Sequence, residues 1–168
     1  TRGGGGSTGD YRLKLTSIDD NSNVMAVSRG GVPHLFGTQD GKLRRFFGEQ
    51  FVSFSPDGKT YVVIRGGVPH VFNTQTGQLV RAYGDAFLSY SPVGDTFIVT
   101  QGGVPHLFRS SDGKLLRYFG DSFIGYGPYG NYYAVLRGGV PHVFESATGK
   151  TVRAYGDSFI SFSPKGRY

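Results

Sequence analysis

A five-residue segment, Gly-Gly-Val-Pro-His, occurs four times in the chain, and each copy begins 36 residues after the previous one. Such a fixed period is the signature of repeat architectures, in which each repeat is one supersecondary unit that cannot bury its apolar face alone. Neighbouring repeats must therefore supply each other's hydrophobic core. The four copies are Gly30–His34, Gly66–His70, Gly102–His106 and Gly138–His142.

The composition favours strands over helices in these repeats. The 168-residue chain is 38% hydrophobic and 15% aromatic, and it contains 28 Gly and 8 Pro. Aromatic residues prefer strands, Gly and Pro prefer turns, and no stretch has apolar residues at helical spacing. We therefore predict an all-β fold. All eight Pro and all four His recur at repeat positions, which disfavours a unique site built around one of them.

The second repeat predicts four short antiparallel strands. Phe51–Ser55 alternates apolar and polar residues, and the Pro and Gly of Ser55–Gly58 suit a tight turn after it. The apolar run Tyr61–Ile64 predicts a strand that is covered on both faces. A third strand is expected around His70 and a fourth over Gln78–Tyr83. Repeated four-stranded meanders are typical of the blades of a β-propeller.

The repeated proline before each His constrains the third strand. Proline lacks the backbone N–H that a central strand donates to its neighbour, so it fits at the first residue of a strand, at an edge or at a bulge. We therefore expect the third strand of each repeat either to begin at its proline or to be bulged there. These prolines are Pro33, Pro69, Pro105 and Pro141.

Two motifs of the repeat resemble the WD-repeat β-propeller family. Ser53–Lys59 is similar to the Phe-Ser-Pro-Asp-Gly turn of that family, and Gly67–Leu79 is similar to the end of its third strand with the following Thr-Gly turn. The resemblance covers the chain from about residue 11 onward and implies blades that present loops to a partner. Phe72 and Asn73 stand where the family has a Trp-Asp pair, and its Gly-His pair is missing. The hydrogen-bonded network that depends on those pairs cannot form here.

Counting strands divides the chain into a tail, four repeats and the start of a fifth. The Gly-rich residues 1–10 are expected to be a flexible tail or linker. An unpaired fifth-repeat strand at residues 159–164 would be an open edge, which readily pairs with another chain. We therefore expect assembly with a second copy or residence in a longer parent protein. The repeats are 11–49, 50–85, 86–121 and 122–157, and residues 159–168 hold the first strand of the incomplete fifth.

Charge and residue usage disfavour several classes of function. The net charge of +6 is spread over the repeats without a basic cluster, so nucleic-acid binding is disfavoured. The absence of Cys excludes disulfides and Cys-type zinc sites. No apolar run approaches the length of a membrane span, so no membrane partner is expected. No nucleophile, base and stabiliser form a recognisable set, so we predict no catalytic residue, no cofactor and no enzymatic activity. The cellular compartment is left open.

The repeated His and Arg positions are interpreted as structural. One His per repeat would place the imidazoles far apart, which disfavours a metal site and favours packed or hydrogen-bonded rings. Each repeat also has an Arg four residues before an acidic residue, and we expect ion pairs there, with an anion-binding ring as the alternative. The histidines are His34, His70, His106 and His142, and the pairs are Arg45–Glu49, Arg81–Asp85, Arg117–Asp121 and Arg153–Asp157.

Two further sets of residues are candidates for contact with a partner. The residues beside the Gly-Gly turns should be exposed, although solvated charge explains them equally well. The residues that end the third strands vary between repeats, as expected at the rim of a scaffold. The first set is Arg29, Arg65 and Arg137, with Gln101 in the third repeat, and the second is Asn73, Arg109 and Glu145, with Gly37 in the first repeat.

These features predict a non-catalytic, propeller-like scaffold for protein–protein interaction or self-assembly. One alternative is a carbohydrate-binding propeller with one shallow site per blade, because aromatic and polar residues recur at rim positions. Another alternative is a subunit of a repeat-protein filament, because of the unfinished fifth repeat. The expected partners are therefore a protein, further copies of the chain or a glycan.

Overall fold

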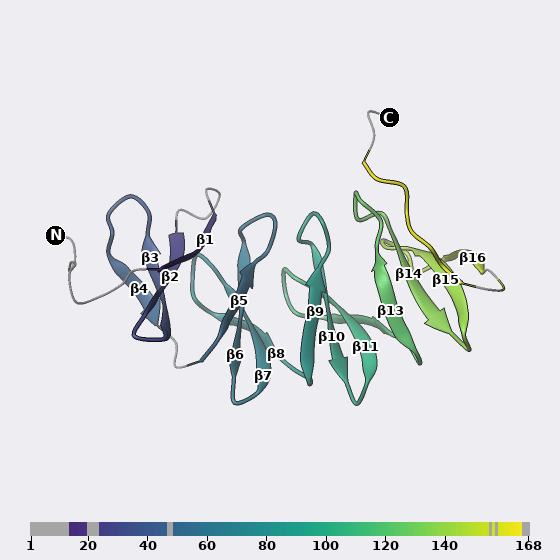
Figure 1. Ribbon diagram of the computed structural model, residues 1–168, viewed down its shortest axis with the longest axis horizontal. Helices are drawn as coiled ribbons and strands as arrows, with labels where there is room; N and C mark the ends of the chain where they lie inside the picture. The colour runs from purple at the N-terminus through teal and green to yellow at the C-terminus, as the bar shows by residue number, and fades with distance from the viewer. Residues whose placement is uncertain (1–13, 20–23, 47–48, 155, 157, 166–168) are drawn as a thin grey trace. The chain divides into compact units, whose positions relative to one another are not determined.

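The computed structural model describes residues 14–19, 24–46, 49–154, 156 and 158–165. These residues form sixteen strands in four antiparallel sheets of four strands each, and they contain no helix (Figure 1). The all-β prediction is therefore confirmed. No helix of membrane-spanning length and hydrophobicity occurs in these residues. The predicted tail, residues 1–10, lies outside the described part of the chain.

Each sheet is a meander in which consecutive strands are hydrogen-bonded neighbours. The first two sheets consist of β1 (Lys14–Asp19), β2 (Val24–Arg29), β3 (Val32–Gly37) and β4 (Leu43–Phe46), and of β5 (Phe51–Phe54), β6 (Thr60–Arg65), β7 (Val68–Asn73) and β8 (Leu79–Ala82). The last two consist of β9 (Ala86–Tyr90), β10 (Thr96–Gln101), β11 (Val104–Arg109) and β12 (Leu115–Tyr118), and of β13 (Ser122–Tyr126), β14 (Tyr132–Arg137), β15 (Val140–Glu145) and β16 (Thr151–Ala154).

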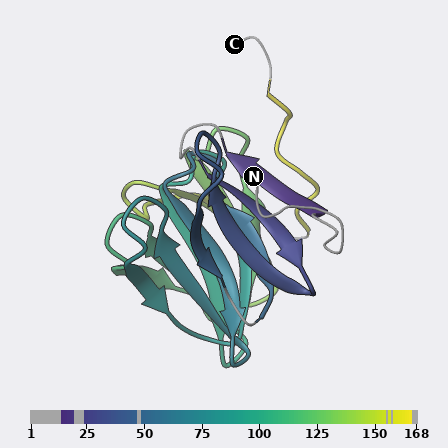
Figure 2. The ribbon, with the colours of Figure 1, turned by 90° about the vertical axis from the view of Figure 1, so that its left-hand side faces the viewer.

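The chain divides into two compact units, each built from two sheets. Unit 1, Thr1–Ala82, holds sheets β1–β4 and β5–β8, and unit 2, Tyr83–Tyr168, holds sheets β9–β12 and β13–β16. The strands of each sheet are twisted (Figure 2), as β-sheets of L-residues are.

The two sheets of each unit share one hydrophobic core. A single sheet cannot cover its own apolar face, so the core forms where the faces of two successive sheets meet. In unit 1 the buried core residues are Val24, Ala26 and Leu35 of the first sheet and Phe51, Tyr61, Val63 and Phe72 of the second. In unit 2 they are Ile98 and Leu107 of the third sheet, Phe119, which follows that sheet's last strand, and Tyr133, Val135 and Phe144 of the fourth.

The second strand of a sheet is buried on both faces. Tyr61, Val62 and Val63 follow one another on β6, so their side chains alternate between the faces of the sheet, and all three have no exposed surface. The prediction that the run beginning at Tyr61 is covered on both faces is confirmed.

The Gly-Gly segment forms a two-residue hairpin turn between the second and third strands. Gly66 and Gly67 have φ angles of 59° and 77°, and only glycine adopts such positive φ angles without steric cost. Two successive residues of this kind form a type I′ turn, whose twist matches that of the flanking strands. The register runs without a shift from the pair Arg65–Val68 next to the turn to the end of the hairpin.

The third strand begins one residue before its proline and has no bulge against the second strand, so that expectation is wrong. Pro69 pairs with Ile64 in a continuous register. The physical reason is seen in the third sheet, where the Pro105 carbonyl accepts a hydrogen bond from Phe119 N at 3.0 Å. The N and O atoms of one strand residue face the same neighbour, so the missing N–H of Pro105 faces β12, which ends at Tyr118. No ladder bond to β10 is lost.

The predicted strand at residues 159–164 is not formed, because no described segment provides the neighbouring ladder that a strand needs. The segment instead packs against the turn between β13 and β14. A Cβ atom added at Gly127 would lie 3.5 Å from Phe162 Cδ1, and Lys165 Nζ lies 5.4 Å from the centre of the Tyr129 ring.

Candidate functional site

The two sets of candidate contact residues lie at opposite ends of the sheets. Successive turns of an antiparallel meander alternate between its two ends. Arg65 and Arg137 end β6 and β14 next to the Gly-Gly turns and are exposed, whereas Arg29 is half-buried. Asn73 and its equivalents end the third strands at the other end of each sheet. The predicted residues therefore do not form one continuous surface.

At the Gly-Gly end, acidic residues bind backbone amides of the turns. Glu49 Oε2 accepts a hydrogen bond from Gly66 N at 2.7 Å, and Asp85 Oδ2 accepts one from Gly102 N at 2.6 Å. Asp121 Oδ2 accepts one at 3.4 Å from Gly139 N, the second glycine of its turn. Each carboxylate thus ties the start of a sheet to its own hairpin turn.

The predicted ion pairs of Arg45 with Glu49 and of Arg117 with Asp121 are wrong. Both carboxylates bond to turn amides, and the two guanidinium groups lie against Gly77 and Gly149 of the following sheet. A guanidinium can satisfy its donors on backbone carbonyls as well as on a carboxylate. The partner predicted for Arg153, Asp157, lies outside the described residues, and Arg81 and Asp85 belong to different units.

At the opposite end, Asn73, Arg109 and Glu145 are used within their own turns. Asn73 Oδ1 accepts hydrogen bonds from Gln75 N and Thr76 N, both at 2.9 Å. Glu145 Oε1 accepts one from Thr148 Oγ1 at 2.6 Å. The three varied residues therefore stabilise three different versions of the same turn. Some of their hydrogen-bonding groups are therefore already used within the turns before any partner binds.

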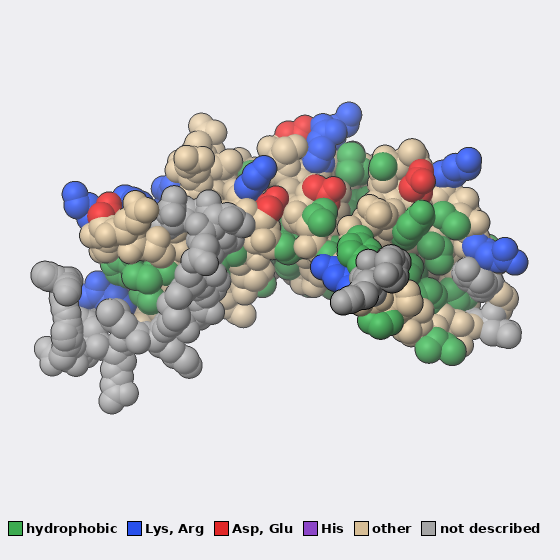
Figure 3. Space-filling view, turned by 90° about the horizontal axis from the view of Figure 1, so that it is seen from above, with side chains coloured by type: hydrophobic (Ala, Val, Ile, Leu, Met, Phe, Trp, Pro, Cys, Tyr) green, Lys and Arg blue, Asp and Glu red, His purple; other side chains and the backbone are tan. Residues whose placement is uncertain are grey.

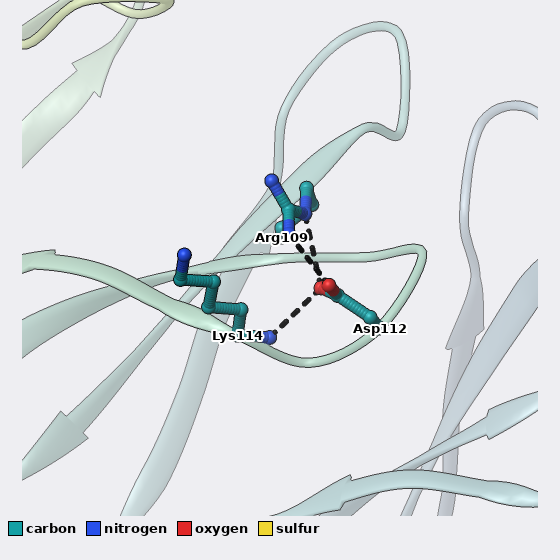
Figure 4. Close-up of polar contacts among 3 residues, drawn as sticks. All are labelled: Arg109, Asp112 and Lys114. Carbon is teal, nitrogen blue, oxygen red and sulfur yellow. Dashed lines mark hydrogen bonds and ion pairs between the residues drawn. The ribbon is translucent and has the colours of Figure 1, made fainter.

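The third-sheet turn contains the tightest of these arrangements. Arg109 Nε donates to Asp112 Oδ1 at 3.0 Å, and Lys114 N donates to the same oxygen at 3.0 Å (Figure 4). The hydrogen bonds from Arg109 and from the Lys114 amide lower the pKa of Asp112 to about 2.

We expect an NMR titration of the Asp112 carboxyl to have its midpoint near pH 2, and the Arg109→Gln variant to move that midpoint upward. The pKa of Asp112 is lower in the folded than in the unfolded chain. The stability that its ionised carboxylate contributes is therefore fully present above about pH 4, and it is lost as the pH falls through the folded pKa. Asp40 is the control, because Gly37 stands at the arginine position in the first sheet and the bond from Lys42 N is the main cause of its lowered pKa. An unchanged Asp112 midpoint in Arg109→Gln would contradict the assignment.

The four histidines are packed and hydrogen-bonded within their sheets. In each one, Nδ1 lies 2.8 Å from the carbonyl oxygen of the Val two residues earlier. A carbonyl only accepts, so Nδ1 carries the proton. Each ring also stacks on the Phe two residues later, as His106 does on Phe108. In the third sheet the exposed ring of Tyr118 stacks on His106 as well, with a centroid separation of 5.4 Å.

A groove of about 390 Å³ lies in unit 2 between strand β12 and sheet β13–β16. Pockets that bind ligands have volumes from roughly 300 Å³ upward. One wall comes from β12 and the residue after it, and the other wall comes from β14, β15 and the turn after β15. The lining residues are Leu115, Leu116, Arg117, Tyr118, Phe119, Tyr133, Arg137, Phe144 and Gly149. Two of them, Arg117 and Arg137, are predicted repeat residues that the structure brings together.

Arg117 reaches from β12 across to the fourth sheet. Its Nη2 donates to the Ser146 carbonyl oxygen at 3.1 Å. Its guanidinium also lies directly against the backbone of Gly149, where a Cβ atom would overlap it. Because Gly149 has no side chain, the guanidinium is held in a fixed orientation beside the groove.

Tyr133 contributes a buried phenol to the same groove. Its side chain has no exposed surface, and its hydroxyl has no hydrogen-bond partner in the described part of the structure. Burial raises the pKa of Tyr133, and the positive charges of Arg117 and Arg137 oppose that shift. The phenol therefore stays protonated at neutral pH and is available as a donor.

The same residue types recur two repeats earlier, in unit 1. Arg45, Tyr61 and Gly77 stand at the positions of Arg117, Tyr133 and Gly149. The Arg45 guanidinium lies against Gly77, and its positive charge opposes the rise in the pKa of Tyr61 that burial causes.

No protein-family model matches the chain, and no curated protein matches it in sequence. Among solved structures it is similar to a eukaryotic initiation factor, with a TM-score of 0.63 and 14% identity over 88% of this chain and 44% of that chain. It is also similar to KlHsv2 with loop 6CD replaced by a Gly-Ser linker (TM-score 0.55, 22% identity, 88% and 55% covered). A third similar structure is Kluyvelomyces marxianus Hsv2 (0.53, 16%, 84% and 51%). The chain spans about half the length of these proteins, and at such identities the likeness concerns the fold alone.

Proposed function

We propose that this chain is a propeller-like, WD-related array of blades that acts as a non-catalytic scaffold for a protein partner. The meander sheets and the likeness to longer solved structures support the propeller-like arrangement. The observation that carries the binding role is Tyr118, which is 69% exposed at the rim of the unit 2 groove. Exposed aromatic residues beside a pocket are the usual anchors of protein interfaces.

The surroundings of Tyr118 support a protein partner. Leu115, on the same short strand, is exposed and lines the same groove. Figure 3 shows hydrophobic side chains gathered over sheet β13–β16, and the exposed hydrophobic residues there include Ile124 and Tyr132 on the strands and Tyr129 in the turn between them. Unit 2 therefore presents exposed hydrophobic residues as well as a preformed groove.

The test is a selection of displayed random peptides on the immobilised chain, followed by affinity measurement for the enriched peptides. We expect enriched peptides to lose about 30-fold in affinity for the Tyr118→Ser variant, as for a hot-spot residue. The control is Phe46→Ser, which changes the equivalent residue of the first sheet at nearly equal exposure, 67%. A selection without enrichment, or peptides that bind both variants equally well, would contradict the proposal.

The other two candidate functions give different outcomes in parallel measurements. A glycan-binding scaffold would be retained on immobilised glycans and would yield no Tyr118-dependent peptide. A filament subunit would show large, concentration-dependent masses in light scattering. Nothing in the described sites favours one glycan site per blade, because Asn73, Arg109 and Glu145 are engaged within turns of different chemistry.

A further inference from the structure

We infer that the unit 2 groove binds a carboxylate side chain of an extended acidic segment in the partner protein, and that this segment lies along the free edge of β12. The inference rests on the proposed scaffold function and specifies its partner. It is carried by the charge of the groove, by the orientation of its donors and by the unpaired edge of β12.

The charge of the groove selects an anion. Arg117 and Arg137 are the charged residues among those that line it, and no Asp or Glu is present in the lining. The rest of the lining is mostly apolar, with Leu116, Phe119 and Phe144 at its walls. Charges that face a partly apolar, water-poor groove interact more strongly than charges on an open surface. A ligand that combines a negative charge with apolar flanks matches this environment.

The donors of the groove are fixed before a ligand arrives. One N–H of Arg117 is used by the Ser146 carbonyl, and the guanidinium lies against Gly149. An arginine has five N–H donors in a planar fork, so donors remain that can bind a carboxylate in the bidentate manner. Holding the fork in place reduces the entropy that binding would otherwise cost.

Tyr133 supplies a neutral donor beside the two arginines. A buried hydroxyl without a partner is rare in folded proteins, because it loses its bonds to water without replacement. The Tyr133 hydroxyl is in this condition, in a side chain with no exposed surface that lines the groove. A carboxylate oxygen in the groove would accept its hydrogen bond.

The strand next to the groove can hold an extended partner. Among the described residues β12 is an edge strand, paired with β11 on one side only, and it spans Leu115–Tyr118. An exposed edge can accept an additional strand, whose backbone supplies the affinity while alternate side chains enter neighbouring pockets. A segment with alternating acidic and apolar residues would direct its acids into the groove and its apolar residues to the other face.

Unit 1 provides a matched comparison within the same chain. There Arg45 and Tyr61 stand at the positions of Arg117 and Tyr133. The groove described above is lined by residues of unit 2 alone. The variant Arg45→Gln is therefore the control for Arg117→Gln, because it changes an equivalent residue outside the proposed site.

The experiment uses the full chain and a fluorescein-labelled peptide, acetyl-Val-Glu-Val-Glu-Val-Glu-amide, with binding followed by fluorescence anisotropy. We expect the peptide with Gln in place of Glu to bind about tenfold more weakly, because charge-assisted hydrogen bonds are lost. Arg117→Gln, Arg137→Gln and Tyr133→Phe should each weaken binding of the acidic peptide, and Arg45→Gln should leave it unchanged. Arg137 is exposed, so its variant keeps the test valid if Arg117→Gln fails to fold.

Equal binding of the Glu and Gln peptides, or unaltered binding of the acidic peptide by Arg137→Gln and Tyr133→Phe, would overturn the inference. Weakening by Arg45→Gln equal to that by Arg117→Gln would also overturn it, because the charge effect would then be general. These outcomes are separate from a failure of the scaffold function. If the displayed peptides depend on Tyr118 but carry no acidic residues, the scaffold stands and the acidic partner is excluded.

Discussion

Replacing Tyr133 by alanine is expected to lower the free energy of unfolding by about 3–5 kcal/mol, the range found for large aromatic residues removed from a core. Tyr133 has no exposed surface and belongs to the core that the two sheets of unit 2 share. Its ring contacts those of Phe144 and Phe119, at centroid separations of 5.5 and 5.6 Å. Removing it leaves a cavity at the point where the sheets meet. Urea denaturation followed by circular dichroism measures the change.

Two control substitutions distinguish the contribution of the Tyr133 ring from that of its hydroxyl and from that of an exposed neighbour on the same strand. Tyr133→Phe keeps the ring and removes a buried hydroxyl without a partner, so its stability should be equal to or higher than that of the parent protein. Tyr132→Ala changes the adjacent, exposed residue and should cost less than about 1 kcal/mol. A loss below 1 kcal/mol for Tyr133→Ala would show that Tyr133 does not hold the sheets of unit 2 together.

The strand order of each repeat was predictable from local patterns. The paired glycines of Gly66-Gly67 require a hairpin with positive φ angles, and the Ser-Pro turn at Ser55–Gly58 precedes the second strand. Between them, the continuous apolar run from Tyr61 is typical of a strand covered on both faces, as the structure shows it to be. These are short-range features, in which each residue type strongly prefers one backbone conformation.

The predictions for the prolines and for the ion pairs were wrong because a sequence does not show which neighbouring strand or sheet a group faces. The fit of Pro105 within its strand depends on which neighbour its missing N–H faces, and this follows from the early end of β12. In the same way, a four-residue spacing brings Arg117 and Asp121 near each other along the chain, but it does not show that the arginine side chain turns to the next sheet. Both answers depend on contacts between strands and between sheets.

The groove was not predicted, for the same reason. Arg117 and Tyr133 belong to different repeats, and their proximity appears only when the two sheets are packed. One signal was present in the sequence: Tyr61 and Tyr133 occupy the same position two repeats apart, whereas Met25 and Phe97 occupy it in the other two repeats. This longer period matches the pairing of sheets into units, because Tyr61 and Tyr133 each lie in the core that the two sheets of one unit share.

Gly149→Ala is expected to destabilise the protein by about 2–5 kcal/mol, the sum of two effects. The first is backbone strain, because Gly149 has a φ angle of 75°, where a side chain costs about 1–2 kcal/mol. The second is displacement of the Arg117 guanidinium, which the new Cβ would overlap. That displacement breaks the bond to the Ser146 carbonyl and leaves partly buried polar groups unsatisfied, at a cost of about 1–3 kcal/mol. Urea denaturation again provides the measurement.

Gly139→Ala isolates the first effect. Gly139 has the same φ angle, 75°, but an added Cβ there would meet no atom within 4 Å, so this variant should lose only the strain energy of about 1–2 kcal/mol. In an Arg117→Ala background, the cost of Gly149→Ala should fall to that same value, since the group it displaces is gone. If Gly149→Ala and Gly139→Ala cost the same in the parent protein, the Arg117 guanidinium is not held against Gly149. The groove would then lack the fixed donor on which recognition of a carboxylate depends.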